Sequence, residues 1–340
     1  MPINDYLNSF LINNPKPDLT AGQLLMFGFD GTKFNSDIRF LIQKLKIGGV
    51  ILFKRNIESP GQVKDLCMAM QEAALSAELP PLFIAVDQEG GAVARLRKPS
   101  FDEYPGASGI KSLKEAEEIS NEMSKVLNNL GFNMNMAPVL DIAFDPSTSI
   151  MKDRAYSDSP EGAAEFGRTV VKTFQKNGIM AVGKHFPGIG RTVLDSHLTL
   201  PLLDTEKEIL IKNDLVPFKA AIDENVSGIM LSHILYKNID SEWPASLSVK
   251  IAGDLLRCEM GYKGLALTDD LDMKAINHDI KTCISRIIMA NIDMTLICSR
   301  NSNQENALDE ILRLCRDNSN ASGNAFKSAE RILIAKEKFI

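Results

Sequence analysis

The sequence is poor in the residues that build metal centres and disulfide frameworks. It has four histidines and no HExxH or HxH pattern, so a histidine-rich zinc site has few options. Its cysteines are odd in number and widely spaced, which fits neither a disulfide framework nor a CxxC metal site. They are Cys67, Cys258, Cys283, Cys298 and Cys315. We expect reduced thiols, no metal and no cofactor.

The chain also lacks an excess of positive charge and a long apolar run. Its formal net charge of −6 argues against nucleic acid or an anionic membrane as a partner, because phosphate binding needs a concentrated basic face. No apolar run reaches the roughly 18 residues of a membrane helix. The N-terminal residues lack the charged and apolar regions of a secretory signal. We predict a cytoplasmic protein and expect a monomer.

Short apolar runs instead alternate with longer helical patterns along the chain. The runs occupy residues 24–29, 48–53, 82–87, 133–139, 180–185, 228–233, 265–269 and 294–299. Near-continuous apolar runs are typical of parallel strands buried on both faces. Helical signals fill the segments between them, with Pro60 opening one helix and Gly131 and Gly178 closing two others. Eight strands that alternate with helices predict one (β/α)8 barrel domain over residues 1–340.

A doubly wound sheet is the alternative fold. The first strand–helix unit has no GxGxxG, which makes a dinucleotide-binding sheet less favoured without excluding it.

Polar residues stand at the predicted carboxyl ends of several strands, where a barrel carries its chemistry. They are Asp87, Asp141, Lys184, His185, His233, Asp269 and Asp270. Charged residues mark strand ends in most proteins, so one such residue indicates little. So many at one rim favour a functional site.

Residues 183–201 hold the densest pattern, GKHFPGIGRTVLDSHLTLP. Asp195 stands two residues before His197 and can accept a hydrogen bond from the imidazole, which would fix its tautomer for acid/base work. The alternative interpretation of residues 195–197 is a turn capped by the aspartate, with the histidine exposed to solvent. Glycine and proline in residues 186–190 indicate a loop with special backbone geometry.

Two further patterns supply carboxylates and guanidinium groups. Asp269 and Asp270 close one apolar run, and alternation along a strand predicts that only one of them points into the barrel mouth. A carboxylate there can attack an anomeric carbon or coordinate a metal. Asp87, Arg95 and Arg154 can bond sugar hydroxyls, although each fits a surface salt bridge equally well.

Together these segments resemble the family 3 glycoside hydrolases, and among them the single-domain bacterial β-N-acetylhexosaminidases of the NagZ type. The resemblance covers about residues 23–298. It includes GGVILFKRNI (48–57), AVDQEGGAVARL (85–96), GFNMNMAPVLDI (131–142), DRAYS (153–157), KHFPGIG with DSH (184–197), SHILY (232–236) and TDDLDM (268–273). The KHFPG-to-DSH element marks the branch whose acid/base is a loop histidine.

The resemblance implies a retaining exo-β-N-acetylglucosaminidase. Asp269 matches the nucleophile, His197 the acid/base and Asp195 its partner. The residues that match the sugar-binding set are Asp87, Arg95, Arg154, Lys184 and His185. The implied substrate is an N-acetylglucosaminyl-1,6-anhydro-N-acetylmuramic acid with or without a peptide, from cell-wall recycling. One departure is Ile189, which stands where family members commonly have His, and we expect it to alter loop packing or aglycone contacts.

The sequence leaves four other hypotheses about function open. A family 3 β-glucosidase and a phosphorylase that transfers the sugar to phosphate are related enzymes. A non-catalytic sugar-binding protein on the same barrel would be expected to lose the catalytic pair, yet Asp195, His197 and Asp269 are all present. A metal-dependent barrel hydrolase predicts inactivation by chelators.

Overall fold

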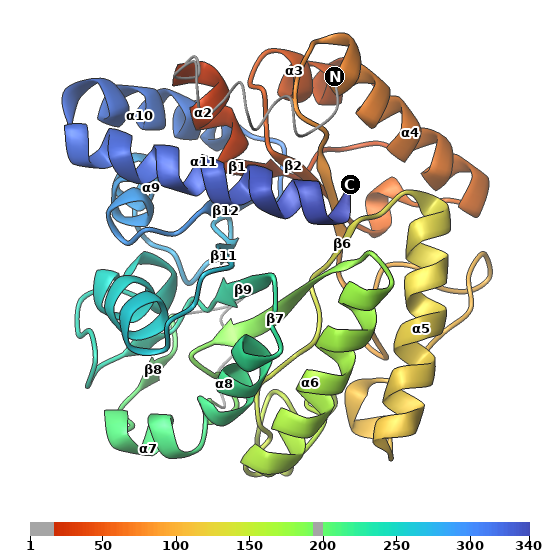
Figure 1. Ribbon diagram of the computed structural model, residues 1–340, viewed down its shortest axis with the longest axis vertical. Helices are drawn as coiled ribbons and strands as arrows, with labels where there is room; N and C mark the ends of the chain where they lie inside the picture. Colours follow the sequence, from red (N-terminus) through yellow and green to blue (C-terminus); the bar gives the residue numbers. More distant parts are fainter. Residues whose placement is uncertain (1–16, 193–199) are drawn as a thin grey trace.

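Eight parallel strands close into one barrel in the computed structural model, which describes residues 17–192 and 200–340 (Figure 1). They are β1 (Leu25–Phe27), β2 (Gly49–Leu52), β3 (Phe83–Val86), β6 (Met134–Asn135), β7 (Met180–Phe186), β9 (Gly228–Leu231), β11 (Leu265–Asp270) and β12 (Met294–Ile297). Each strand is paired with the next in this order, and β12 pairs with β1. Each predicted apolar run overlaps one strand, so the predicted (β/α)8 barrel is confirmed. The closed sheet rules out the doubly wound alternative.

Helices lie on the outside of the barrel (Figure 1). They are α2 (Pro17–Gln23), α3 (Ser36–Gln43), α4 (Pro60–Ser76), α5 (Leu113–Leu130), α6 (Pro160–Lys176), α7 (Lys207–Lys212), α8 (Val216–Asp223), a π-type helix (Val249–Glu259), α9 (Ile280–Met289), α10 (Asn303–Asp317) and α11 (Ser319–Phe339). Across residues 17–192 and 200–340, no helix combines the length and the apolar composition that a bilayer crossing requires.

Serine caps set where the three helices after β2, β3 and β6 begin. Ser59, Ser112 and Ser159 each accept a hydrogen bond from the backbone N–H three residues later, at 3.3, 3.2 and 3.2 Å. These bonds satisfy N–H groups that the first helical turn leaves without a partner. Proline follows the first and third caps, at the position where its missing N–H costs nothing.

A short antiparallel hairpin extends the chain beyond β3 and brings charged residues over the barrel mouth. Its strands are β4 (Gln88–Gly90) and β5 (Val93–Ala94). The turn needs glycine at Gly90, where φ is +99° and a Cβ would lie 2.2 Å from the Pro105 carbonyl oxygen. The hairpin therefore packs closely against residues 104–106, which fixes its direction.

A buried lysine lies where α2 and α11 close the amino ends of the strands. Lys336 is fully buried, and its Nζ donates to the Gln23 amide oxygen at 2.7 Å and lies 5.5 Å from the centre of the Phe83 ring. Burial lowers the pKa of Lys336 to about 7.

Replacing Lys336 by Met is expected to raise the free energy of unfolding at pH 7 and to flatten its pH dependence. Between pH 7 and about 10 the unfolded chain binds a proton that the folded chain does not, so wild-type stability rises with pH in this window. The shift corresponds to at most about 5 kcal/mol. Urea unfolding at pH 7 and pH 10 measures the effect, with exposed Lys338→Met as the control. Equal pH dependence in wild type and the Lys336 variant would contradict it.

Candidate active site

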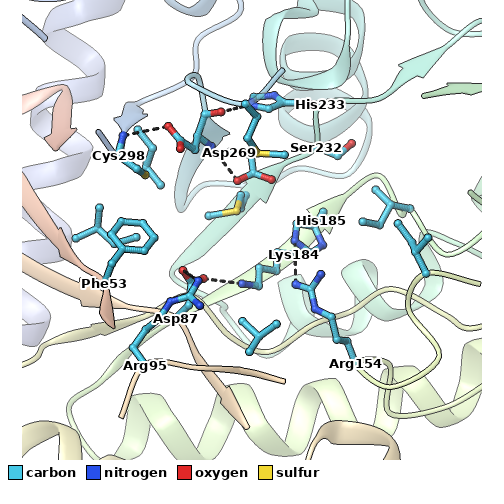
Figure 2. Close-up of a pocket in the computed structure, with 18 residues that line it drawn as sticks. Phe53, Asp87, Arg95, Arg154, Lys184, His185, Ser232, His233, Asp269 and Cys298 are labelled. Carbon is cyan, nitrogen blue, oxygen red and sulfur yellow. Dashed lines mark hydrogen bonds and ion pairs between the residues drawn. The ribbon is translucent and has the colours of Figure 1, made fainter. Parts of the chain in front are cut away.

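A cavity of about 400 Å³ opens at the carboxyl ends of the strands (Figure 2). Of the eight residues that the family resemblance assigns to catalysis or sugar binding, six line it, namely Asp87, Arg95, Arg154, Lys184, His185 and Asp269. The other two, Asp195 and His197, lie outside the described residues. Pockets of this size, with a few convergent polar groups, are typical of small-ligand sites.

A buried ion network forms one side of the cavity. Lys184, at the end of β7, places its Nζ 2.9 Å from Asp87 Oδ1 and 2.6 Å from Glu89 Oε1. Arg95 donates to the second oxygen of Asp87 at 3.0 Å. Arg154 donates two hydrogen bonds to the Glu89 carboxylate, from Nε at 2.9 Å and from Nη2 at 2.7 Å. Each carboxylate is therefore shared by two cations, a geometry that holds all five side chains in place.

These ion pairs keep the network charged despite its burial. Burial alone would raise the pKa of Asp87, but the Lys184 and Arg95 cations hold it well below its usual value. Burial opposes ionisation of Glu89 as well, and Lys184 and Arg154 lower its pKa. Burial would lower the pKa of Lys184, whereas Asp87 and Glu89 raise it. The cavity thus presents fixed charges that can bond hydroxyl groups at neutral pH.

Glu89 was not among the residues predicted from the sequence. It stands two residues after Asp87 in the motif AVDQEGGAVARL. Because side chains two residues apart in an extended chain point to the same side, Glu89 could be placed on the side of Asp87. The hairpin that turns this side toward Lys184 could not be predicted from that spacing.

His185 is oriented by Asp141, which follows β6. Nδ1 of His185 lies 2.7 Å from Asp141 Oδ2, and the His185 backbone N–H donates to the same oxygen at 3.2 Å. A carboxylate accepts hydrogen bonds, so Nδ1 carries a proton, and Nε2 is the nitrogen that can accept when the imidazole has a single proton. Arg154 Nη2 lies 3.5 Å from that Nε2. Asp141 stood at a predicted strand end, and its role as an orienting group became visible only in the structure.

Asp269 and Asp270 both contribute to the cavity lining, and Oδ1 of Asp270 is bonded to backbone N–H groups of the chain. That only one of the two side chains points into the barrel mouth stays a prediction. The register between β11 and β12 is irregular here: Leu267 pairs with Met294 but Asp270 pairs with Leu296, so β11 has one more residue than β12 in this interval. Such a bulge breaks the alternation of side chains and re-aims them. The Thr268 hydroxyl oxygen accepts from the Leu296 backbone N–H at 3.0 Å and replaces a ladder bond.

The two carboxyl groups have different surroundings. Asp269 accepts one hydrogen bond from the Asp270 backbone N–H, to Oδ1 at 2.8 Å. Figure 2 shows its carboxyl group across the cavity from Lys184 and Asp87. Asp270 Oδ1 accepts from the backbone N–H of Asp272 and of Cys298, each at 3.0 Å. Burial raises the pKa of Asp270 to about 6, and these bonds oppose the shift only in part.

Apolar side chains complete the wall, and apart from Ile189, which the family motif had singled out, no pattern in the sequence distinguished them from core residues. They are Ile51, Phe53, Val93, Ile150, Ile189, Met230, Met273, Leu296 and Cys298. The guanidinium groups of Arg55 and Arg95 lie 4.8 and 5.4 Å from the centre of the Phe53 ring. Apolar and aromatic surface beside fixed polar groups suits a sugar, which has both apolar faces and hydroxyl edges.

Residues 188–192 are held tightly to the barrel before the chain enters 193–199. The Ile189 backbone N–H donates to Asp141 Oδ1 at 2.8 Å, and the Ser149 hydroxyl donates to the Gly190 carbonyl at 3.0 Å. Arg191 Nε lies 2.9 Å from Asp214 Oδ2. Ile189 lines the cavity, and its effect on loop packing or aglycone contacts stays a prediction.

Within residues 17–192 and 200–340, no three His, Cys, Asp or Glu side chains are grouped as a metal site would require.

A model of the glycosyl hydrolase family 3 N-terminal domain matches residues 18–334. The chain belongs to glycosyl hydrolase family 3. The β-hexosaminidase of Alkalilimnicola ehrlichii is 35% identical over 300 residues, which cover 85% of this chain and 83% of that one. The β-hexosaminidase of Pseudomonas aeruginosa strain LESB58 is 35% identical over 297 residues, covering 85% and 86%. These relatives place the chain among the β-hexosaminidases of the family and confirm the resemblance predicted from the motifs.

Solved structures share this fold over most of the chain. A family 3 β-N-acetylglucosaminidase from Paenibacillus sp. FPU-7 matches with a TM-score of 0.89 and 33% identity, over 95% of this chain and 62% of that one. A β-N-acetylhexosaminidase from Beutenbergia cavernae matches with a TM-score of 0.87 and 25% identity, over 95% and 98%. The match to β-hexosaminidase A of Pseudoalteromonas piscicida spans 44% of that protein, so some relatives are much longer than the region in common.

Proposed function

We propose that this chain removes a terminal β-linked N-acetylglucosamine from peptidoglycan fragments by retaining hydrolysis. The proposed substrate is the N-acetylglucosaminyl-1,6-anhydro-N-acetylmuramic acid unit, with or without its peptide. The observation that carries the proposal is a carboxylate, Asp269, at the end of β11 of a family 3 barrel, facing a cavity lined by ion-paired hydrogen-bonding groups. A cytoplasmic location and a monomeric state remain predictions, which cell fractionation and light scattering test.

The sugar-binding role falls to the charged side of the cavity. Asp87 keeps lone pairs free to accept sugar hydroxyls while Lys184 and Arg95 hold its two oxygens in place. Arg154 and Arg95 offer N–H donors, and Nε2 of His185 offers an acceptor. These groups are positioned before substrate binds, so little reorganisation accompanies binding.

Asp269 attacks the anomeric carbon in the proposed first step. The Asp270 N–H donates to Oδ1 and so helps to orient the carboxylate. His197 gives its proton to the glycosidic oxygen as the bond to the aglycone breaks, and a covalent glycosyl-enzyme results. Neutral His197 then takes a proton from water, which displaces Asp269 from the sugar. Two inversions at the same carbon give net retention.

His197→Ala is expected to slow substrates with poor leaving groups far more than activated ones. An acid catalyst contributes roughly 100-fold or more when the departing oxygen must be protonated, and little when it leaves as a stable phenolate. The measurement is kcat/KM over a series of aryl N-acetyl-β-glucosaminides, with His185→Ala as the comparison because that histidine is assigned to binding. Equal losses across the series for His197→Ala would contradict the acid role.

Incubation with purified muropeptides, followed by mass analysis of the released sugar, tests the reaction and its substrate. Free N-acetylglucosamine, formed at the same rate with and without phosphate, is the expected product. A sugar phosphate in phosphate buffer would identify a phosphorylase, and release of glucose from a β-glucoside at a higher rate would identify a β-glucosidase. Binding without product would identify a sugar-binding protein, and loss of activity with chelator would indicate a metal enzyme.

A further inference from the structure

His233 is a buried residue of the cavity to which the reaction as described gives no role. It follows β9, is 1% exposed, and lines the cavity together with Asp269 and Asp270. Its Nε2 lies 2.8 Å from the backbone carbonyl oxygen of Asp270, and its Nδ1 lies 2.7 Å from the Ser246 hydroxyl (Figure 2 shows the first bond). The imidazole therefore spans from the loop after β9 to the end of β11.

The contact between Nε2 of His233 and the Asp270 carbonyl determines where the imidazole carries a proton. A backbone carbonyl only accepts hydrogen bonds, so Nε2 must carry a proton and donate it to Asp270. The Ser246 hydroxyl can donate or accept, so it can pair with Nδ1 whether or not that nitrogen carries a proton. Ser246 is itself fixed, because its backbone N–H donates to the Ser232 carbonyl at 3.0 Å.

Asp270 is the residue through which this contact reaches Asp269. Its carbonyl accepts from His233, its Oδ1 accepts from the backbone N–H of Cys298, and its own N–H donates to Asp269 Oδ1. The bulge leaves residues 268–270 with fewer regular ladder bonds to β12, so these side-chain and backbone bonds replace the ladder. These bonds set the orientation of the Asp270 backbone. That orientation determines where the Asp270 N–H points, and therefore how the Asp269 carboxylate is held.

We propose that His233 is a positioning residue for the nucleophile, which it aims by donating from Nε2 to the Asp270 carbonyl. The inference rests on the proposed function, because it assumes that Asp269 attacks the sugar. A nucleophile held within about 0.5 Å of its productive place reacts efficiently, and a displacement of about 1 Å costs roughly 100-fold in rate. His233 contributes to kcat through this alignment and leaves the sugar-binding groups unchanged.

Two substitutions at one position separate positioning from general damage. His233→Met keeps the bulk but removes the donor, and kcat on an aryl N-acetyl-β-glucosaminide is expected to fall roughly 100-fold with KM nearly constant. His233→Gln places an amide N–H near Nε2, and kcat is expected to recover by at least about 10-fold relative to His233→Met. Buried Ser328→Ala, which removes a bond to Asp293 away from the cavity, should lower the Tm without changing kcat.

A second comparison removes the group that His233 is proposed to aim. In Asp269→Gly, azide attacks the anomeric carbon in place of the carboxylate, the aryloxide leaves, and an α-glycosyl azide forms. Adding His233→Met to that background should leave azide-dependent turnover unchanged within about twofold, because no carboxylate remains to be aligned.

The outcomes divide cleanly between the two proposals. Wild-type kcat in His233→Met, equal kcat in the Met and Gln variants, or the same 100-fold loss in the azide reaction would overturn the role of His233. Full activity of Asp269→Gly without azide would instead overturn the nucleophile, and with it the proposed function.

Discussion

Asp269→Ala should lower kcat on an aryl N-acetyl-β-glucosaminide by roughly 10⁴-fold or more while leaving the fold intact. Removing a nucleophile that forms a covalent intermediate costs more than removing a group that only binds, because no other residue supplies the bond to carbon. The side chain lies at the cavity surface and its Oδ1 accepts one N–H from the neighbouring residue, so folding depends little on it. Initial rates and the Tm of purified variants measure both effects.

Asp279→Ala is the matched control for this change. Asp279 is an exposed carboxylate that caps α9 in the segment after β11, accepting from the Thr282 N–H at 3.1 Å. Its loss should lower the Tm slightly and leave kcat unchanged. Retention of a tenth or more of wild-type kcat in Asp269→Ala would rule out the proposed nucleophile.

Lys184→Met should impair both substrate binding and stability. It leaves Asp87 and Glu89 without the cation they share, and breaking a buried ion pair from one side costs about 3–5 kcal/mol. If Asp87 is no longer held in place, its charged hydrogen bond to the sugar is lost. A loss of about 3 kcal/mol there lowers kcat/KM roughly 100-fold. Urea unfolding at pH 7 and initial rates measure the two losses. The exposed pair of Lys237 and Asp204 gives the control, since Lys237→Met should change neither quantity appreciably.

The same variant should change how stability falls in acid. In the wild type the lowered pKa values of Asp87 and Glu89 contribute stability that is present above about pH 4 and is lost as pH falls through the lower, folded-state values. Without Lys184 both pKa values rise toward or above the unfolded values, so this contribution shrinks and the acid loss begins at a higher pH. Identical acid-unfolding midpoints for the two proteins would contradict the network described here.

The strands could be predicted because a barrel of parallel strands buries both faces of each. Runs such as 48–53 and 228–233 are apolar almost throughout, and turns and capped helices separate them, so both the type and the order of the elements follow from pattern alone. The polar residues that end these runs meet in space because parallel strands share one carboxyl edge. This is why Asp87, Lys184 and Asp269 line one cavity although they are far apart in the chain.

Other features of the site depend on geometry that a pattern does not encode. The bulge at residues 267–270 brings both Asp269 and Asp270 into the cavity lining, and a strict two-residue period could not anticipate it. The hairpin after β3 brings Glu89 to Lys184 through close packing of glycine backbone. Phe53, Met230 and Met273 are apolar like the residues of the core, so only their position in the structure identifies them as part of the cavity wall.

The covalent intermediate is the most direct measure of the proposed chemistry. An activated N-acetyl-β-glucosaminide that reacts quickly in the first step and slowly in the second should leave the sugar attached to the enzyme, and acid quenching followed by peptide mass mapping locates it. We expect the mass of one N-acetylglucosaminyl group on the peptide that contains Asp269, and none in Asp269→Ala. A sugar attached to another residue, or turnover with no covalent adduct at any quenching time, would contradict the proposed mechanism.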